Sequence, residues 1–176
     1  MTSGIRAATP ADADGIALVH VRSWQSAYRG LVPHEHLDQL DAARRAQRWT
    51  RSLAGSDPSR EATLVTVTDE QVTGFASVGP ARDADADPAR TGEVYSIYLL
   101  PQAWGQGLGR DLMAAALAGL ADRGYQVVTL WVLKDNARAR RFYEAAGFTA
   151  DGSEQTVDIA GSPIAEVRCR RILGPL

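Results

Sequence analysis

Apolar residues in the first part of the chain follow the spacing of one strand and then of helices. The short apolar run Ile5–Ala8 predicts a first strand, which stops at Thr9-Pro10. Thr9 as an N-cap and Pro10 at the first helical position predict that a helix starts there. Apolar and small residues recur on one face at helical spacing, so this helix should run to about Tyr28. Gly30 then breaks the pattern.

The next segment predicts a second helix, and after it a β-hairpin. The helix is expected over His34–Leu53. The β-branched runs Ala62–Thr68 and Val72–Val78 follow, separated by a short polar turn at Asp69-Glu70-Gln71. Two such runs joined by a short polar turn predict antiparallel pairing. A further strand is expected over Glu93–Leu100.

The second half alternates between helical and strand periodicity. Its predicted elements are a helix over Gly107–Arg123, a buried strand over Val127–Leu133, a helix over Asn136–Ala146, and a hairpin of Thr149–Ile159 with Ile164–Leu173. Gly124 and Gly147 stand where the two helices should end. The whole pattern predicts an α/β (α+β) fold with about seven strands and four helices. One strand–helix–strand crossover makes a central parallel pair, and hairpins pair the other strands antiparallel.

Composition narrows the class of protein without indicating a reaction. The chain has 176 residues, 45% of them hydrophobic, and a net charge of −2, which fits one domain over residues 1–176. Such a balance argues against non-specific nucleic-acid binding. The start at Met1 shows no secretory leader, and the longest apolar runs fall short of the roughly 20 residues of a membrane span. A soluble, cytoplasmic protein is expected, and the single cysteine, Cys169, cannot form an intrachain disulfide.

The most informative segment is a glycine-rich turn between the strand at Glu93–Leu100 and the following helix. Gly105, Gly107 and Gly109 occupy alternate positions there. Glycine can adopt positive φ and lets the backbone approach a ligand closely. The free N–H groups at the start of the helix would then favour an anion such as a pyrophosphate.

Two familiar phosphate-binding patterns do not fit this turn. A P-loop needs Lys and then Ser or Thr after its last glycine, but Arg110-Asp111 follows Gly109. A dinucleotide fingerprint starting at Gly105 would need glycine at position 110 and would follow the first strand of a parallel series.

A second motif lies one strand downstream. The residues 136–148 follow the pattern N-x-x-A-x-x-x-Y-x-x-x-G-F, with Asn136, Ala139 and Tyr143 at helical intervals on one face. Taken singly, these residues also fit an N-cap, a packing alanine and a half-buried aromatic side chain.

Together, the glycine turn and this motif resemble the GNAT N-acetyltransferase superfamily. The turn is similar to the family's pyrophosphate loop, Gln/Arg-x-x-Gly-x-Gly/Ala, with Gly107 and Gly109 in the glycine positions. Trp104 stands where the family has Gln or Arg. The resemblance extends from Ile5 to about Leu173 and implies that the central parallel strands splay apart.

The resemblance also implies a set of cofactor contacts. Acetyl-CoA would be the cosubstrate, with its pantetheine arm in the gap between the splayed strands and no metal ion. The cofactor-binding residues it implies are Ile97, Tyr98, Leu99, Trp104, Gly105, Gln106, Gly107, Leu108, Gly109, Arg110, Asn136, Ala139 and Tyr143. A backbone N–H near Leu99 would hold the developing oxyanion.

Two side chains are candidates for proton transfer. An alkyl ammonium has a pKa near 10.4 and must lose a proton before it attacks, and Glu93 is the candidate base. Glu93 also fits a solvated carboxylate at the end of a strand. Tyr143 is the candidate acid, because a phenol stays protonated at neutral pH and can donate to a thiolate.

The acceptor is expected to lie against the first two helices. Trp24 and Tyr28 are candidate substrate contacts together with Glu93, although Trp24 and Tyr28 also fit core or dimer packing. His34 and His36 suggest a metal ion, but a helix turns them about 200° apart and no third ligand is evident.

A run of acidic residues before the expected strand Glu93–Leu100 also suggests a metal site. Asp83, Asp85 and Asp87 imitate the first ligands of a calcium loop. The later positions of an EF-hand are not met, so a solvated loop is expected.

These observations predict an acetyl-CoA-dependent N-acetyltransferase that acts on a primary amine in a ternary complex. A covalent cysteine intermediate is disfavoured because Cys169 falls in the last strand. Two alternatives stay open: a non-catalytic acyl-CoA-binding or sensing module, and a different nucleotide-binding enzyme. The expected partners are a small-molecule or peptide amine and a second copy of the chain in a homodimer, with no nucleic acid and no membrane.

Overall fold

The computed structural model describes residues 3–174. Its strands are β1 Ser3–Ala7, β2 Ala62–Thr68, β3 Gln71–Pro80, β4 Thr91–Leu99, β5 Val127–Leu133, β6 Thr149–Ile159 and β7 Ser162–Ile172. Its helices are α1 Ala13–Ala27, α2 His34–Asp38, α3 Ala42–Gly55, α4 Leu108–Asp122 and α5 Ala137–Ala145. A 3-10 turn at Pro10–Asp12 precedes α1, and Thr9 and Asp12 form the capping box that the sequence predicts.

The strands form one seven-stranded sheet in the order β1-β2-β3-β4-β5-β7-β6. All neighbours are antiparallel except the central pair, β4 and β5. That parallel pair has only three residue pairs, which end at Glu93 opposite Thr129. Beyond this point both strands continue for several residues without pairing to each other. The mixed sheet and its splayed centre are therefore confirmed.

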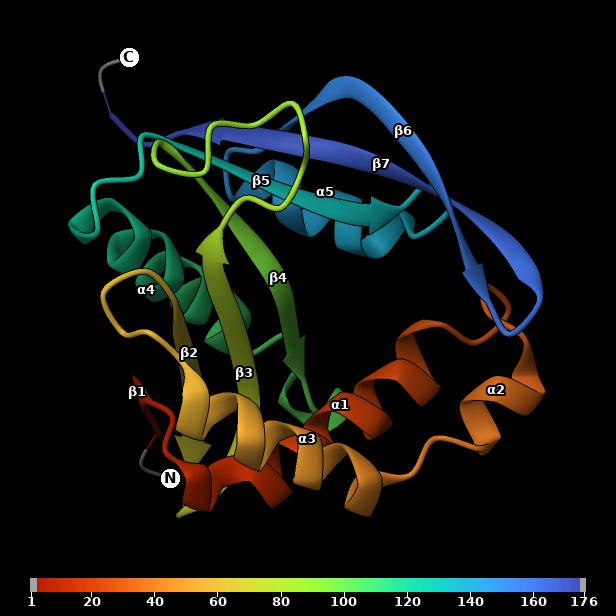
Figure 1. Ribbon diagram of the computed structural model, residues 1–176. Helices are drawn as coiled ribbons and strands as arrows, with labels where there is room; N and C mark the ends of the chain where they lie inside the picture. Colours follow the sequence, from red (N-terminus) through yellow and green to blue (C-terminus); the bar gives the residue numbers. More distant parts are fainter. Residues whose placement is uncertain (1–2, 175–176) are drawn as a thin grey trace.

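Helices cover both faces of the sheet (Figure 1). The helices α1 and α3 pack together across one face of the β1–β4 half, and α4 lies on the opposite face. The helix α5 lies beneath β5 and β7. Fully buried side chains of the main core include Phe75 of β3, Leu112 of α4 and Phe148 after α5.

The predicted elements are confirmed apart from the second helix. The expected single helix over His34–Leu53 is two helices, α2 and α3, because Gln39–Asp41 interrupt it. Asp41 adopts an extended conformation and its carboxylate accepts hydrogen bonds from the N–H groups of Ala43 and Arg44. This N-cap starts a new helix, so the chain has five helices rather than four.

A second, smaller hydrophobic cluster joins α2 to the far end of the β6–β7 hairpin. Val32, Leu37 and Leu133 form its buried centre, and Ile159 and Ile164 from the hairpin pack against it. In Figure 1 the tip of the hairpin reaches over toward α2. The cluster brings the end of β5, the hairpin and the first helices together around one space.

The acidic loop between β3 and β4 is exposed over most of its length, as the sequence predicts, but ion pairs that the sequence did not indicate also hold it. Arg168 of β7 binds Asp85 with two nitrogens, at 2.7 and 2.8 Å, and also reaches Asp83 at 3.2 Å and Asp151 at 2.7 Å. The Arg168 side chain is only 12% exposed. The register of β5 and β7 places Arg168 opposite Trp131, whose indole N–H donates to Asp83. The loop is thereby fastened to the second half of the sheet.

Arg168→Met should lower the free energy of unfolding by about 3 kcal/mol, because it leaves partly buried carboxylates without their counter-charge. Urea denaturation measures the change. The control is Lys134→Met, which breaks the exposed pair between Lys134 and Glu154 and should cost less than about 1 kcal/mol. Equal losses in the two variants would show that Arg168 contributes no more than a surface ion pair.

Within residues 3–174 no helix combines the length and apolar character needed to cross a bilayer. The leaderless start expected from the sequence begins at Met1, which lies outside the described residues.

Candidate active site

A cavity of about 500 Å³ opens where β4 ends and where α4 and α5 begin. It lies at the splayed centre of the sheet. Its lining residues are Ser23, Ala27, Tyr28, Ile97, Tyr98, Leu99, Ala103, Trp104, Gly105, Gly107, Gly109, Arg110, Asn136, Arg138, Ala139, Phe142 and Tyr143. Most of the expected cofactor-binding residues are therefore side by side. Two are not: the side chain of Gln106 bonds back to the Gln102 carbonyl, and Leu108 packs against the main core.

The glycine turn has the backbone geometry of an anion-binding helix start. Gly107 is the N-cap of α4 with φ +83°, and Gly105 has φ +75°. Both values are in the left-handed region, which favours glycine. A Cβ on Gly109 would lie 3.4 Å from side chains of Leu99 and Phe142, so its absence lets α4 approach β4 and α5. The 15-residue helix α4 thus begins at the cavity, where Gly107 and Gly109 place no side chain of their own over its first N–H groups.

Trp104, which stands where the GNAT pattern has Gln or Arg, makes two contacts in this turn. Its indole N–H donates to the Leu99 carbonyl at 3.0 Å and so closes the end of β4. The guanidinium of Arg138, from the first turn of α5, lies 3.6 Å from the centre of the Trp104 ring. This stacking holds a positive charge at the cavity, beside the glycine turn.

The face of α5 that the sequence singled out lines the same cavity. The Asn136 side-chain oxygen accepts a hydrogen bond from the Ala139 N–H, so Asn136 is the N-cap of α5. Its amide nitrogen donates to no described residue. The Tyr143 hydroxyl likewise has no hydrogen-bond partner within residues 3–174. Burial, with smaller effects of Tyr98 and Cys169, raises the pKa of Tyr143 above its usual value.

A second, more enclosed cavity of about 270 Å³ lies on the other side of the splayed strands. The two cavities share five lining residues: Tyr28, Ile97, Tyr98, Ala139 and Tyr143. Its remaining lining residues are Trp24, Arg82, Glu93, Val94, Tyr95, Ser96, Trp131, Val132, Leu133, Gln155, Ile159 and Glu166. The two cavities therefore lie next to each other at these residues, one of which is Tyr143. We call this second space the acceptor cavity.

Glu93 lies in the acceptor cavity but is fully engaged. The residue is 2% exposed. Its carboxylate accepts three hydrogen bonds from Arg82: one from the backbone N–H at 3.0 Å, one from Nε at 3.1 Å and one from Nη2 at 2.6 Å. The bond to Glu93 raises the pKa of Arg82, whose guanidinium also lies over the Tyr95 ring. Glu93 is therefore not the solvated carboxylate that one interpretation of the sequence expected.

An aromatic cluster built around His20 supports the wall of the acceptor cavity. The His20 ring is stacked on Tyr98 with centroids 5.3 Å apart and lies 5.6 Å from Trp24. Arg45 of α3 lies 3.1 Å from His20 Nε2, so this nitrogen accepts the bond and the proton belongs on Nδ1, which has no partner among the described residues. Burial, together with the Arg45 charge, lowers the pKa of His20 to about 3.

This histidine should make the folded state less stable in mild acid. The unfolded chain takes up a proton near pH 6.5, whereas folded His20 does so only near pH 3, so its contribution is fully present above pH 6.5 and is lost as the pH falls from 6.5 to 3. Between pH 6.5 and 4.5 the free energy of unfolding should fall by at most about 1.4 kcal/mol per pH unit from this group. Calorimetric melting across this range measures it. His20→Phe should flatten the dependence, and an unchanged slope in that variant would assign it to other groups.

Trp24 and Tyr28, the candidate substrate contacts, both face the acceptor cavity. Their rings meet edge to face with centroids 4.8 Å apart, and the Tyr28 hydroxyl lies 3.3 Å from that of Tyr98. His34, by contrast, pairs with Asp38 at the exposed start of α2. Among the described residues no group of three or more His, Cys, Asp or Glu side chains is arranged to hold a metal ion. Cys169 is buried and lines neither cavity.

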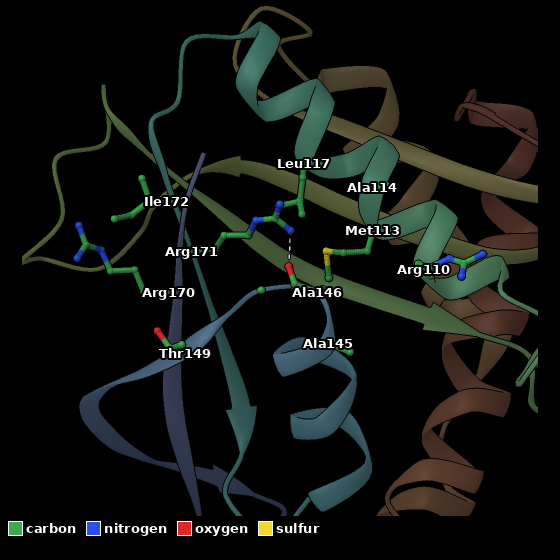
Figure 2. Close-up of a pocket in the computed structure, with 11 residues that line it drawn as sticks. Arg110, Met113, Ala114, Leu117, Ala145, Ala146, Thr149, Arg170, Arg171 and Ile172 are labelled. Atoms are coloured by element: carbon green, nitrogen blue, oxygen red, sulfur yellow. Dashed lines mark hydrogen bonds between the residues drawn. The ribbon is translucent and has the colours of Figure 1, made fainter. Parts of the chain in front are cut away.

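A third hollow, of about 660 Å³, lies between α4 and the end of α5 (Figure 2). It adjoins the first cavity, because Arg110 lines both. Figure 2 shows Arg171 of β7 reaching toward α4 and bonding to the Ala146 carbonyl, which caps the end of α5. Its neighbours Arg170 and Ile172 extend to the other side of the strand, as the alternation of a strand requires.

Several residues of the site could not be identified from the sequence. Glu166 and Trp131 line the acceptor cavity together, with Arg168 beside Trp131, only because of the register of β5 with β7. Arg82 and Arg138 are two arginines in a chain that has many. The one available signal was strand alternation, which places Glu166 and Arg168 on the same face of β7.

A sheet splayed at its centre, with a glycine-rich helix start on one side and an aromatic cavity on the other, is the arrangement of an acetyltransferase of the GNAT type. Residues 19–148 match the acetyltransferase (GNAT) family. The chain belongs to this family.

Known relatives agree with this assignment. The chain is 34% identical to YuaI, an uncharacterised N-acetyltransferase of Bacillus subtilis, over 93% of this chain and 89% of that protein. Among solved structures, YncA of Salmonella typhimurium, crystallised with acetyl-CoA, has a TM-score of 0.75 and 22% identity, with 100% of this chain and 96% of that one covered. The PaiA N-acetyltransferase of Thermoplasma acidophilum, in complex with coenzyme A, has a TM-score of 0.73 and 20% identity over 98% and 100%. At these identities the two structures show a common fold.

Proposed function

We propose that this protein transfers an acetyl group from acetyl-CoA to a primary amine by direct attack within a ternary complex. The observation that carries the proposal is the meeting of two cavities at Ile97, Tyr98 and Tyr143. Direct transfer requires the thioester and the amine to touch, and two neighbouring cavities on the splayed strands would allow such a contact. The buried Cys169, whose pKa is raised by burial, lies apart from both cavities and so supports a mechanism without a cysteine intermediate.

The residues at the glycine turn fit the pyrophosphate of acetyl-CoA. The N–H groups that begin α4 after Gly107 would bind it, helped by the helix dipole. Arg138, held against Trp104, would add the positive charge that tryptophan cannot supply at position 104. The nucleotide end would pass Arg110 and lie against the hollow shown in Figure 2.

The arm of the cofactor would occupy the gap between β4 and β5. Backbone groups of Ile97, Tyr98 and Leu99 that face this gap have no partner on β5 and would pair with the pantetheine amides. The free side-chain nitrogen of Asn136 would donate to the same arm. A backbone N–H near Leu99 would stabilise the oxyanion that forms on the thioester carbonyl.

Tyr143 would protonate the departing thiolate. Its hydroxyl borders both cavities, has no described partner, and keeps its proton because burial raises its pKa. On the acceptor side two carboxylates could receive the amine's proton, Glu93 and Glu166. Glu93 accepts three hydrogen bonds from Arg82, and these would have to weaken before its carboxylate could take a proton from the amine. Its assignment as the base stays a prediction.

The proposal is tested in two stages with the purified chain. Acetyl-CoA should raise the melting temperature, and NAD or ATP should raise it less. Thiol release is then followed with a broad panel of amines, including alkylamines, amino acids, aminoglycosides and peptides. Stabilisation by NAD or ATP alone would overturn the assignment of the cofactor. Binding of acetyl-CoA without thiol release on any amine would favour a binding module instead.

A further inference from the structure

The acceptor cavity carries an uncompensated negative charge. Three charged side chains line it: Arg82, Glu93 and Glu166. Arg82 and Glu93 form a close ion pair and cancel each other. Glu166 has a neutral partner, since its Oε2 accepts a hydrogen bond from the side-chain amide of Gln155 at 2.8 Å. No cationic side chain within residues 3–174 pairs with it.

Glu166 also lies beside the part of β5 that is no longer paired with β4. It lies on β7 opposite Leu133, at the splayed end of β5. Burial is the main cause that raises the pKa of Tyr28 and of Tyr98, two of the five shared residues, and the charge of Glu166 adds a smaller effect in the same direction. Glu93 lies where β4 and β5 are still paired, and its charge acts instead on Tyr95 and Arg82.

The rest of the cavity suits a small organic cation. Its volume of about 270 Å³ is roughly half the 500 Å³ of the first cavity, so it has room for a small group. Trp24, Tyr28 and Trp131 contribute aromatic surface to its lining. Aromatic faces attract ammonium groups, and the carboxylate of the partly exposed Glu166 adds a negative charge beside them.

We propose that Glu166 is the carboxylate that receives the acceptor, and that the acceptor is a small primary amine with no carboxylate near its amino group. This inference rests on the proposed function. Glu166 takes one proton from the ammonium, and the neutral nitrogen attacks the thioester carbonyl carbon. The C–N bond forms and the C–S bond breaks, the thiolate takes the Tyr143 proton, and the second proton of the nitrogen restores the Tyr143 hydroxyl. The products are the acetamide, free CoA and one proton, which Glu166 releases to water.

Charge selectivity tests this assignment. Propylamine and β-alanine have the same chain length and differ by one carboxylate, so their ratio of kcat/KM reports the charge of the cavity. The wild-type enzyme should prefer propylamine by at least about tenfold. Glu166→Gln should lower kcat/KM for propylamine by about thirtyfold and bring the ratio within about threefold. The Kd of acetyl-CoA should not change, because Glu166 does not line the first cavity.

Two comparisons separate a catalytic role from a structural one. The control is Glu154→Gln, which removes an exposed carboxylate on β6. It should leave kcat/KM for propylamine and for β-alanine within twofold of the wild-type values. In Glu166→Gln the rate should rise with pH toward the pKa of the free amine near 10.4, whereas the wild-type rate should level off earlier. The other titratable or charged groups lining the cavity are Tyr28, Arg82, Glu93, Tyr95, Tyr98 and Tyr143, and they are present in both proteins.

The possible failures are distinguishable. An active wild-type enzyme whose charge selectivity and pH profile are unchanged in Glu166→Gln overturns the role of Glu166. An enzyme that acts on larger or acidic amines of the panel but not on propylamine overturns the substrate class. If the protein binds acetyl-CoA but none of the amines in the panel causes thiol release, the proposed function itself is overturned.

Discussion

Replacing Gly107 with valine should raise the Kd of acetyl-CoA by at least about thirtyfold, which corresponds to about 2 kcal/mol. Gly107 has φ +83° and begins α4, so a β-branched residue must either strain the backbone or turn the first N–H groups of the helix away. A Cβ at this position would also lie 3.4 Å from the Arg110 guanidinium. Isothermal titration with acetyl-CoA measures the loss.

The matched control for this variant is at the other end of the same helix. Gly124 has φ +88°, and a Cβ there would meet no atom within 4 Å. Gly124→Val therefore imposes similar backbone strain away from the cavity. It should lower the melting temperature and leave the Kd of acetyl-CoA within about twofold. If both variants weaken binding equally, the effect is a general loss of stability and the glycine cradle is wrong.

Tyr143→Phe should lower kcat by about a hundredfold, the lower end of what a positioned acid contributes. The phenyl ring keeps its contacts with Phe142 and Phe148, so the KM for acetyl-CoA should stay within about twofold. The thiolate then has to take its proton from water. Steady-state kinetics with the best amine of the panel measures both constants.

Tyr125→Phe is the corresponding control for the loss of a phenol. The Tyr125 hydroxyl donates to the Arg60 carbonyl at 3.1 Å, and Tyr125 lines neither cavity. This variant should lose some stability and retain kcat. A Tyr143→Phe enzyme with unchanged kcat would remove the acid role from Tyr143 and assign protonation of the thiolate to solvent.

The parts of the fold that could be predicted from the sequence depend on local chemistry. The cap at Thr9, the turn glycines Gly124 and Gly147, and the apolar run of β5 each act within a few residues. The break between α2 and α3 is also local, but the apolar spacing continues across it, and only the backbone of Asp41 shows that a new helix begins there.

The candidate site divides in the same way. The glycine turn and the α5 face are each continuous in sequence, so their patterns pointed to the cofactor side. The acceptor side is assembled from α1, β4, β5, α5, β6 and β7. Which residues meet there depends on strand register: a shift of one residue in the β5–β7 pairing would turn Glu166 to the opposite face. No local pattern encodes that choice.

The short pairing between β4 and β5 has a consequence for how the protein unfolds. Within residues 3–174, β4 and β5 join the two halves of the sheet through only three residue pairs, to which the bonds of Arg168 and Trp131 to the acidic loop add side-chain links. Beyond Glu93, alternate residues of β4 have backbone amides that face β5 but are not paired with it. Deuterium should therefore exchange into these amides early in the ligand-free protein. A ligand lying in the gap would bridge the halves as an additional strand does. Binding of a ligand in the gap should then slow the deuterium exchange of these β4 amides. It should also make the two halves of the sheet unfold in one cooperative transition rather than partly independently.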